Sequence, residues 1–242
     1  MANFYLLEEL ADARAGGTVT VAGAEAKHIA TVARTRVGER LLVGNGRGLV
    51  VDGVVEQVTP ASVSVRALQV EQTDAASPRI LLAQALAKGD RDELAIQAAT
   101  ELGVDGVIPW QAERSVSRWA GPKLDKGRER WATIVREAAK QSMRPWLPAV
   151  APLATTKELA GLGARHRVLV LEPGARHPIT SLTPDGRDLL LVVGPEGGVA
   201  PAELEVLEAA GAELVRLGDT VLRTSTAGPA ALAVLNAALG RW

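Results

Sequence analysis

The most constraining feature of this 242-residue sequence is an unbroken apolar run, residues 189–193, that leads directly into a glycine-rich segment, residues 194–198 (GPEGG). Such a run predicts a strand that is buried on both faces, as in a parallel sheet covered by helices. Pro201 then stands where the first turn of a helix is expected, and Glu203 and Glu205 suit the positive end of that helix. This order predicts a ligand site at the carboxyl edge of a parallel sheet, although an ordinary tight turn has the same pattern.

A second segment near the end of the chain repeats this arrangement. Residues 214–217 are an expected strand, and a polar segment, residues 223–226 (RTST), leads into a helix expected from Ala227 onward. Because each polar loop follows a strand, the two loops are expected to meet at one edge of the sheet and share a pocket. Residues 194–198 lack the G-x-G-x-x-G spacing of dinucleotide-binding folds, and the chain has no Walker A lysine.

Composition limits the classes of protein that fit. Hydrophobic residues make up 47% of the chain, cysteine is absent, and the three histidines are scattered. The sequence therefore excludes disulfides and a cysteine nucleophile, and it predicts no metal site. No apolar run reaches the roughly 18 residues of a membrane span, and no signal peptide is expected, so we expect a cytoplasmic protein without membrane attachment.

Basic residues are concentrated in two parts of the chain, although the formal net charge is −1. Residues 27–47 carry five Lys or Arg against one acid, and residues 113–144 carry nine against four. Contact with a phosphate backbone needs local patches of this kind rather than a high global charge. From charge alone, solvated surface is the preferred interpretation of any single residue of these patches, especially on the helix expected around residues 126–140.

Two differently patterned regions follow one another along the chain. Residues 1–72 contain short alternating strands and glycine turns, which predict a small β-barrel-like domain. Residues 73–78 are polar and turn-rich and are the expected linker. Residues 79–242 alternate between buried strands and helices, which predicts an α/β domain with a parallel sheet. We expect helices over residues 90–102 and 128–143 within it.

Several motifs, taken in order, resemble the SPOUT class of RNA methyltransferases, and specifically its bacterial RsmE type, which methylates N3 of a uridine in 16S rRNA. The motifs are Ala87-Lys88-Gly89-Asp90-Arg91, Thr100-Glu101-Leu102-Gly103-Val104, Glu113-Arg114-Ser115, Glu137-Ala138-Ala139-Lys140-Gln141-Ser142, the GPEGG segment and the final LRTSTA segment. The resemblance covers nearly the whole chain. It implies a SPOUT-type parallel sheet with a C-terminal trefoil knot, preceded by a PUA-like RNA-binding β domain, and it implies a homodimer.

The resemblance also implies a reaction and the residues that serve it. The cofactor is S-adenosyl-L-methionine, and the partner is the 16S rRNA of the small ribosomal subunit. The implied cofactor-binding residues are Leu171, Glu172, Pro173, Gly194, Pro195, Glu196, Gly197, Gly198, Leu217, Gly218, Val221, Leu222, Arg223, Thr224 and Ala227. The candidate RNA-binding residues are Arg34, Arg36, Arg47, Lys88, Arg114 and Arg144.

Two of these residues are the catalytic candidates. Arg223 would stabilise the negative charge that develops on the uracil oxygens, unless it only ties its loop to a carboxylate. Glu196 would orient the cofactor or cap the next helix. Many family members have Glu where this chain has Ser225, and no general base is assigned.

Other functions fit the same features. One is a nucleotide- or phosphate-binding enzyme that uses Gly197 and Gly198 as an anion-binding nest. Another is a non-catalytic RNA-binding or assembly protein. Binding of ATP would favour the first, and RNA binding without a cofactor would favour the second. Within the methyltransferase class, another base or another RNA is the main competitor.

Overall fold

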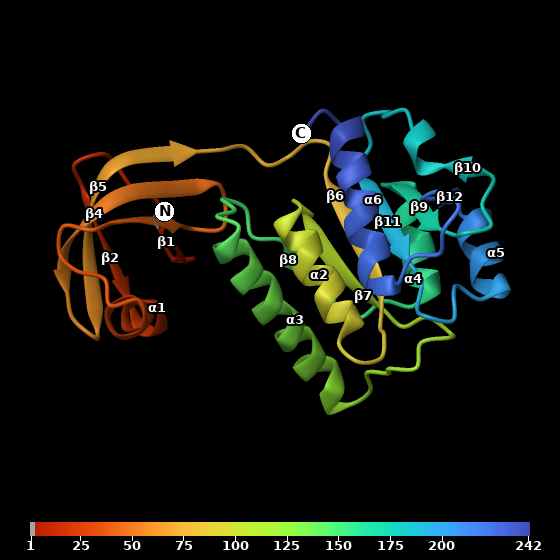
Figure 1. The fold of residues 1–242 in the computed structure, drawn as a ribbon, viewed down its shortest axis with the longest axis horizontal. Coiled ribbons are helices and arrows are strands. Elements are labelled where there is room, and N and C mark those ends of the chain that lie inside the picture. The colour runs from red at the N-terminus through yellow and green to blue at the C-terminus, as the bar shows by residue number, and fades with distance from the viewer. Residues whose placement is uncertain (1–2) are drawn as a thin grey trace. The chain divides into compact units, whose positions relative to one another are not determined.

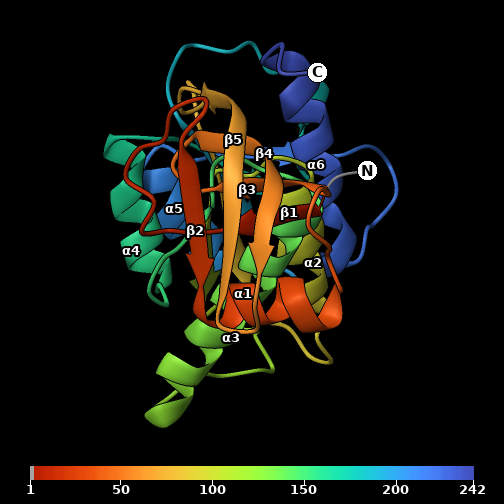
Figure 2. The same ribbon diagram turned by 90° about the vertical axis from the view of Figure 1, so that its left-hand side faces the viewer.

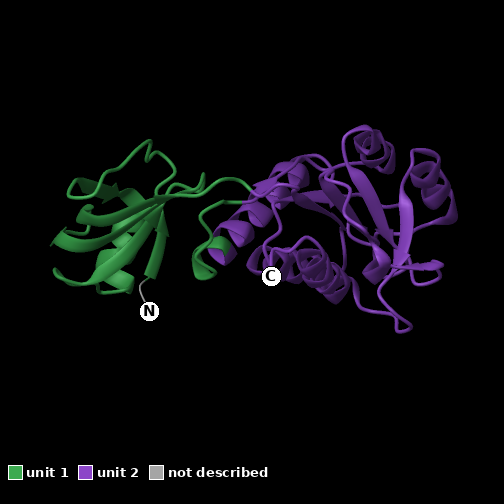
Figure 3. Ribbon diagram, turned by 90° about the horizontal axis from the view of Figure 1, so that it is seen from above, with its two compact units in different colours: residues 1–75, 139–147 green, residues 76–138, 148–242 purple. Residues whose placement is uncertain are grey.

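The computed structural model describes residues 3–242, and the chain divides into two compact units (Figure 3). Unit 1 consists of residues 1–75 and 139–147, and unit 2 of residues 76–138 and 148–242. The expected linker, residues 73–78, contains the first point of division. The proposed domain boundaries remain a prediction, because a second, distant segment also belongs to unit 1.

Unit 1 is a five-stranded sheet in the order β1-β3-β4-β5-β2 (Figure 2). Alternate residues of its strands, such as Val19 and Val21, are buried in one apolar core, because successive side chains of a strand point to opposite faces. The elements are β1 Asn3–Leu6, β2 Thr18–Ala22, α1 Gly23–Lys27, the π-helical turn η1 His28–Val32, β3 Arg40–Gly44, β4 Leu49–Val58 and β5 Ser62–Gln72. This sheet confirms the small β domain expected from the alternating pattern.

Residues 139–147 belong to unit 1 because of specific polar contacts. The Lys140 Nζ atom donates a hydrogen bond to Glu25 Oε1 at 3.0 Å, and the two side chains are only 9% and 15% exposed. The backbone N–H of Gly48 donates to the Pro145 carbonyl at 2.9 Å. These contacts join segments that are far apart in sequence, so no local pattern predicted them.

Unit 2 is a seven-stranded, entirely parallel sheet in the order β10-β12-β9-β11-β6-β7-β8 (Figure 1). The strands are β6 Ile80–Ala85, β7 Gly106–Trp110, β8 Ala149–Val150, β9 Arg167–Leu171, β10 His177–Pro178, β11 Leu189–Val193 and β12 Glu213–Arg216. Strand β11 lies between β9 and β6, and all five of its residues are buried. The apolar run therefore has the structure that the sequence predicted for it.

Helices cover both faces of this sheet. Helices α2 and α6 pack together on one face, and α4 and α5 pack together on the other (Figure 1). The helices are α2 Arg91–Glu101, α3 Pro122–Gln141, α4 Thr156–Gly161, α5 Pro201–Ala209 and α6 Thr224–Ala238, with 3₁₀ turns η2 Leu162–Ala164 and η3 Ile179–Ser181. None of the helices within residues 3–242 combines the length and apolarity that crossing a membrane requires.

Two helices begin earlier than the sequence indicated. Helix α6 begins at Thr224 rather than Ala227, because Arg223 is extended (φ −65°, ψ 149°) and acts as the N-cap. Helix α3 begins at Pro122 rather than at residue 128; its first residue suits the fixed φ of proline, and Gly121 before it has φ +53°. The polar segment 223–226 is therefore mostly the first turn of α6 rather than a loop.

Candidate functional site

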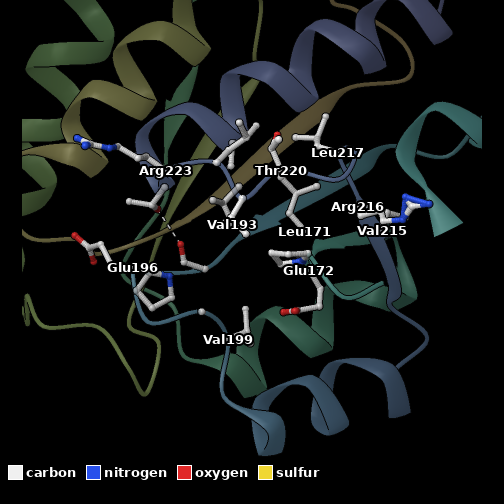
Figure 4. A pocket seen from close by; sticks show the side chains of 18 of the residues that line it. Leu171, Glu172, Val193, Glu196, Val199, Val215, Arg216, Leu217, Thr220 and Arg223 are labelled. Atoms are coloured by element: carbon white, nitrogen blue, oxygen red, sulfur yellow. Dashed lines mark hydrogen bonds between the residues drawn. The ribbon is translucent and has the colours of Figure 1, made fainter. Parts of the chain in front are cut away.

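A cavity of about 420 Å³ lies at the carboxyl edge of the parallel sheet of unit 2 (Figure 4). Ligands of α/β proteins bind at this edge, where the loops that follow neighbouring strands converge. Here the loops follow β9, β11 and β12, as the sequence predicted. The lining residues are Arg91, Leu171, Glu172, Pro173, Val193, Gly194, Pro195, Glu196, Gly198, Val199, Val215, Arg216, Leu217, Gly218, Thr220, Val221, Leu222, Arg223, Thr224 and Ala227.

The residues expected to bind the cofactor meet at this cavity, with one exception. Gly197 does not line it; instead its carbonyl accepts a hydrogen bond from Arg114 Nη1 at 3.0 Å on the outer side of the loop. Six lining residues were not expected from the sequence: Arg91, Val193, Val199, Val215, Arg216 and Thr220. Val193 and Val215 belong to the strands themselves, and Arg91 is the first residue of α2, which follows β6.

A buried polar network lies behind one wall of the cavity. The Thr224 hydroxyl donates to the Gly194 carbonyl at 2.8 Å and accepts from Gln84 Nε2 at 2.9 Å. Gln84 is fully buried on β6 and Thr224 is 6% exposed. Because buried polar groups are costly when unpaired, this network fixes the first turn of α6 against the end of β11. A glutamine inside an otherwise apolar strand was the available sequence signal, and it was missed.

Glu196 does not cap the helix that follows it. Its Oε1 atom accepts a hydrogen bond from the backbone N–H of Lys88 and another from Arg91 Nη1, each at 3.0 Å. Burial raises the pKa of Glu196, but the hydrogen bonds from its own N–H, Lys88 and Arg91 outweigh this and hold the pKa below its ordinary value. Glu196 is therefore ionised at neutral pH and faces the segment between β6 and α2.

Arg223 extends from the N-cap of α6 with an exposed side chain. No hydrogen bond or ion pair to its guanidinium is found within residues 3–242, so a structural tie between Arg223 and a carboxylate is not present there. In Figure 4 the charged ends of Glu196 and Arg223 lie at one side of the view, and that of Arg216 lies at the other. Arg223 is thus a charged group at the cavity without a committed partner in the described chain.

Glu203 anchors the segment that carries Arg114. Its side chain is 7% exposed, and its Oε1 atom accepts hydrogen bonds from the Glu113 backbone N–H at 3.0 Å and from the Thr156 hydroxyl at 2.6 Å. The sequence assigned Glu203 only to the helix dipole. In the structure it also holds the loop after β7 beside the glycine loop, where Arg114 contacts Gly197.

The six candidate RNA-binding residues divide between the units. Arg34, Arg36, Arg47 and Arg144 belong to unit 1, and Lys88 and Arg114 belong to unit 2. Arg34 and Arg36 lie in the exposed segment between η1 and β3, as expected. The pair in unit 2 lies on two loops that each contact residues 194–198.

No group of three or more His, Cys, Asp or Glu side chains in residues 3–242 is arranged to hold a metal ion. His28, for example, packs edge-on against Tyr5 with ring centroids 6.0 Å apart. The side chains available at the cavity are instead apolar groups, carboxylates and guanidinium groups.

Comparison with known proteins agrees with this geometry. Residues 75–236 match the model of a family described as an RNA methyltransferase domain, and residues 21–68 match an RNA methyltransferase PUA domain. The fold and the site are therefore those of the class of RNA methyltransferases. This confirms the PUA-like β domain followed by an α/β methyltransferase domain that the motifs implied.

Two relatives and two solved structures define the family more closely. A Ribosomal RNA small subunit methyltransferase E of Mycobacterium bovis is 41% identical over 100% of this chain and 94% of its own length. One of Bacillus subtilis is 33% identical over 90% of each chain. The chain therefore belongs to the ribosomal RNA small subunit methyltransferase E family.

The structural neighbours cover almost the whole chain. A Neisseria gonorrhoeae enzyme of this name, bound to S-adenosyl methionine, superimposes with a TM-score of 0.88 at 27% identity over 98% of both chains. A putative methyltransferase from Legionella pneumophila, in complex with the same cofactor, gives 0.85 at 29% identity over 98% of both chains.

Proposed function

We propose that this protein methylates N3 of a specific uridine in the 16S rRNA of the small ribosomal subunit, with S-adenosylmethionine as the methyl donor. The observation that carries the proposal is the cavity at the carboxyl edge, because the loops after β9, β11 and β12 that line it are the loops implied by the family motifs. Membership in the family supports the same RNA and the same cofactor.

The cavity fits the proposed cofactor in size and chemistry. Its volume of about 420 Å³ lies within the range of small-molecule sites. Leu217, Val221 and Leu222 offer apolar surface to the adenine ring, and the backbone groups of residues 194–198 and 217–224 can bind its polar edge. When bound, S-adenosylmethionine supplies a methyl group on a positively charged sulfur, which needs no further activation.

The chain must position the uridine and stabilise the negative charge that forms on the uracil ring. N3 of uracil has to lose its proton before or during transfer, and the resulting negative charge spreads over the two uracil oxygens. Arg223, an exposed cation at the cavity without a described partner, can stabilise that charge because it needs no reorganisation from another ion pair. No side chain is assigned as the general base; at position 225, where many family members have Glu, this chain has Ser.

We further propose that the C-terminal region forms the trefoil knot of the SPOUT class, that the protein works as a homodimer in the cytoplasm, and that domain boundaries follow residues 1–72 and 79–242. Family membership supports these proposals. The PUA-like unit would then bind RNA in addition to the contacts made by the methyltransferase unit. Its candidate residues are Arg34, Arg36, Arg47 and Arg144.

The test is to incubate the purified protein with labelled S-adenosylmethionine and unmethylated small ribosomal subunits, and to identify the product nucleoside by mass spectrometry. We expect a single 3-methyluridine in 16S rRNA. A different methylated nucleoside would keep the cofactor and change the target. Absence of cofactor binding in a calorimeter would overturn the enzymatic proposal altogether.

A further inference from the structure

The glycine loop, residues 194–198, lines the cavity and also contacts the segments that follow β6 and β7. Glu196 Oε1 accepts hydrogen bonds from the Lys88 backbone N–H and from Arg91 Nη1, and the Gly197 carbonyl accepts one from Arg114 Nη1. All three contacts are 3.0 Å long. Residues 194–198 therefore contact three basic residues: Arg91 and Arg114 through their side chains and Lys88 through its backbone.

Arg91 is the cation of this group that also lines the cavity. Its side chain is 42% exposed, and within residues 3–242 the structure gives it one side-chain partner, Glu196. A guanidinium group has five N–H donors, so most of its donors remain available to a ligand. The planar arrangement of these donors matches the oxygens of a phosphate group.

The ion pair between Arg91 and Glu196 does little for the stability of the fold. Pairs between partly exposed side chains typically stabilise a protein by less than about 1 kcal/mol. The pair instead fixes the orientation of the Arg91 guanidinium group, which stands at the end of a long and otherwise flexible side chain. Glu196 fixes the backbone of Lys88 by the same atom, and the Lys88 side chain is exposed.

We propose that Glu196 is a positioning residue and that Arg91 is an RNA-binding residue. Glu196 holds the Arg91 guanidinium group, and it holds the backbone from which the Lys88 side chain extends, so that both cations meet the phosphates of the RNA at the mouth of the cofactor cavity. The inference rests on the proposed function, because it takes the ligand to be RNA. It replaces cofactor binding, the role that the sequence suggested for Glu196, with placement of the RNA.

The sign of one effect separates positioning from simple electrostatics. Replacing Glu196 by Gln removes a negative charge near the RNA, and on charge alone the variant should bind RNA more tightly. If Glu196 positions Arg91 and Lys88, the variant should bind RNA more weakly. The amide keeps the size of the side chain, so the fold is expected to survive this change.

Asp188 provides a matched control in the same unit. Its two oxygens accept hydrogen bonds from the Arg79 backbone N–H at 2.8 Å and from Arg79 Nε at 2.9 Å. The exposed fractions of this pair, 53% and 24%, are close to those of Arg91 and Glu196, 42% and 25%. Asp188→Asn therefore removes the same kind of contact at the other edge of the sheet.

The experiment measures RNA binding by fluorescence anisotropy over a range of salt concentrations, with an unmethylated 16S rRNA transcript, and S-adenosylmethionine binding by calorimetry. For Arg91→Ala we expect about tenfold weaker RNA binding and a salt slope smaller by about one phosphate contact. For Glu196→Gln we expect RNA binding weakened about threefold or more, and in the double variant a loss smaller than the product of the single losses. Because both residues line the cavity, cofactor affinity is measured in each variant, and the inference requires that RNA binding falls by a larger factor than cofactor binding.

Three results would overturn the inference. The first is unchanged RNA affinity and salt slope in Arg91→Ala. The second is tighter RNA binding in Glu196→Gln. The third is an equal loss of RNA binding in the Asp188→Asn control. Loss of cofactor affinity in Glu196→Gln with normal RNA binding would also contradict it, because it would show that Glu196 binds the cofactor and does not position the RNA-binding residues. Failure of the unsubstituted protein to bind S-adenosylmethionine would instead overturn the proposed function.

Discussion

The two edges of the parallel sheet in unit 2 differ in how completely their charged groups are paired: the carboxyl edge has one ion pair, Arg91 with Glu196, and also a cation without a partner among residues 3–242. At the amino edge, Asp188 binds Arg79, and Asp105 binds Arg241 at 2.8 Å and the Ile80 backbone N–H at 2.7 Å. At the carboxyl edge, Arg223 has no partner within residues 3–242, although it stands beside a cavity. Charges that are paired hold strands in register, whereas a cation that is left unpaired is available to a ligand.

The largest effect is expected from Arg223 itself. Arg223→Ala should lower the turnover of methyl transfer by about 10²-fold or more, as the loss of one preorganised charge-stabilising group typically does. The measurement is labelled methyl transfer to unmethylated small ribosomal subunits. Arg79→Ala, at the amino edge, should leave turnover within about twofold at a temperature where the variant is folded. Equal turnover in the two variants would remove Arg223 from the mechanism.

Two glycines test whether crowding at each edge has the same consequence. A Cβ atom at Gly194 would lie 2.8 Å from Val199 Cγ2, and one at Gly106 would lie 2.9 Å from Leu81 Cδ2. Gly194→Ala and Gly106→Ala should each lower the free energy of unfolding by about 1–3 kcal/mol, as overpacking does. Only Gly194→Ala should also weaken cofactor binding, by about tenfold in calorimetry. A similar loss of affinity in Gly106→Ala would show that general destabilisation, not loop geometry, controls binding.

The buried network behind the cavity is expected to matter through its hydroxyl group. Thr224→Val leaves Gln84 Nε2 and the Gly194 carbonyl without their shared partner, which should lower the free energy of unfolding by about 1–3 kcal/mol. Thr224→Ser keeps the hydroxyl and should lose less than half as much. Thermal unfolding at one pH measures both variants, and a loss in Thr224→Ser as large as that in Thr224→Val would show that the methyl group contributes as much as the hydroxyl network.

The last comparison uses the pH dependence of stability, which should have opposite signs for Asp92 at the carboxyl edge and Asp188 at the amino edge. Burial raises the pKa of Asp92, in the first turn of α2, from 3.8 to about 6. The folded state therefore binds a proton more readily than the unfolded state, and the free energy of unfolding falls as the pH rises from the ordinary pKa of 3.8 to about 6. Asp92→Asn should be more stable than the unsubstituted protein at pH 7.5 by about 1–3 kcal/mol, and this advantage should vanish as the pH falls towards 4.

Asp188 at the amino edge should behave in the opposite way. Burial raises its pKa, but hydrogen bonds from the Arg79 backbone and side chain outweigh this and lower it. The ionised form therefore contributes stability above the ordinary pKa of aspartate, and this contribution is lost as the pH falls. Asp188→Asn should be slightly less stable at pH 7.5, with the difference shrinking in acid. Unfolding curves of both variants between pH 4 and 8 test the two signs together.

The sequence predicted the parts of this molecule that depend on local pattern. The apolar run 189–193, the glycine loop after it and Pro201 at the start of α5 were all confirmed, because strand burial and helix starts are determined by neighbouring residues. The start of α6 was placed three residues too late, because polar residues 224–226 were taken for a loop and form the first helical turn.

Contacts between distant segments could not be predicted in this way. Arg91 reaches Glu196 because β6 pairs with β11, and no periodicity within either segment specifies that pairing. The same holds for Lys140 and Glu25, which bring the end of α3 into unit 1. The motif resemblance supplied the loops of the site, but the partners of their charged groups came only from the structure.

The position of β11 between β6 and β9 also bears on how the chain is made. The partner of β6 on one side, β7, follows it closely in the chain, but the partner on its other side, β11, is synthesised much later. Arg79 and Asp188, which close the pairing at the amino edge, are 109 positions apart. At 5–20 residues per second a ribosome needs about 5–20 s to cover that distance. During this time the nascent chain carries a strand that is apolar except for Gln84 and has one open edge, which is a site for pairing with other chains until β11 is added.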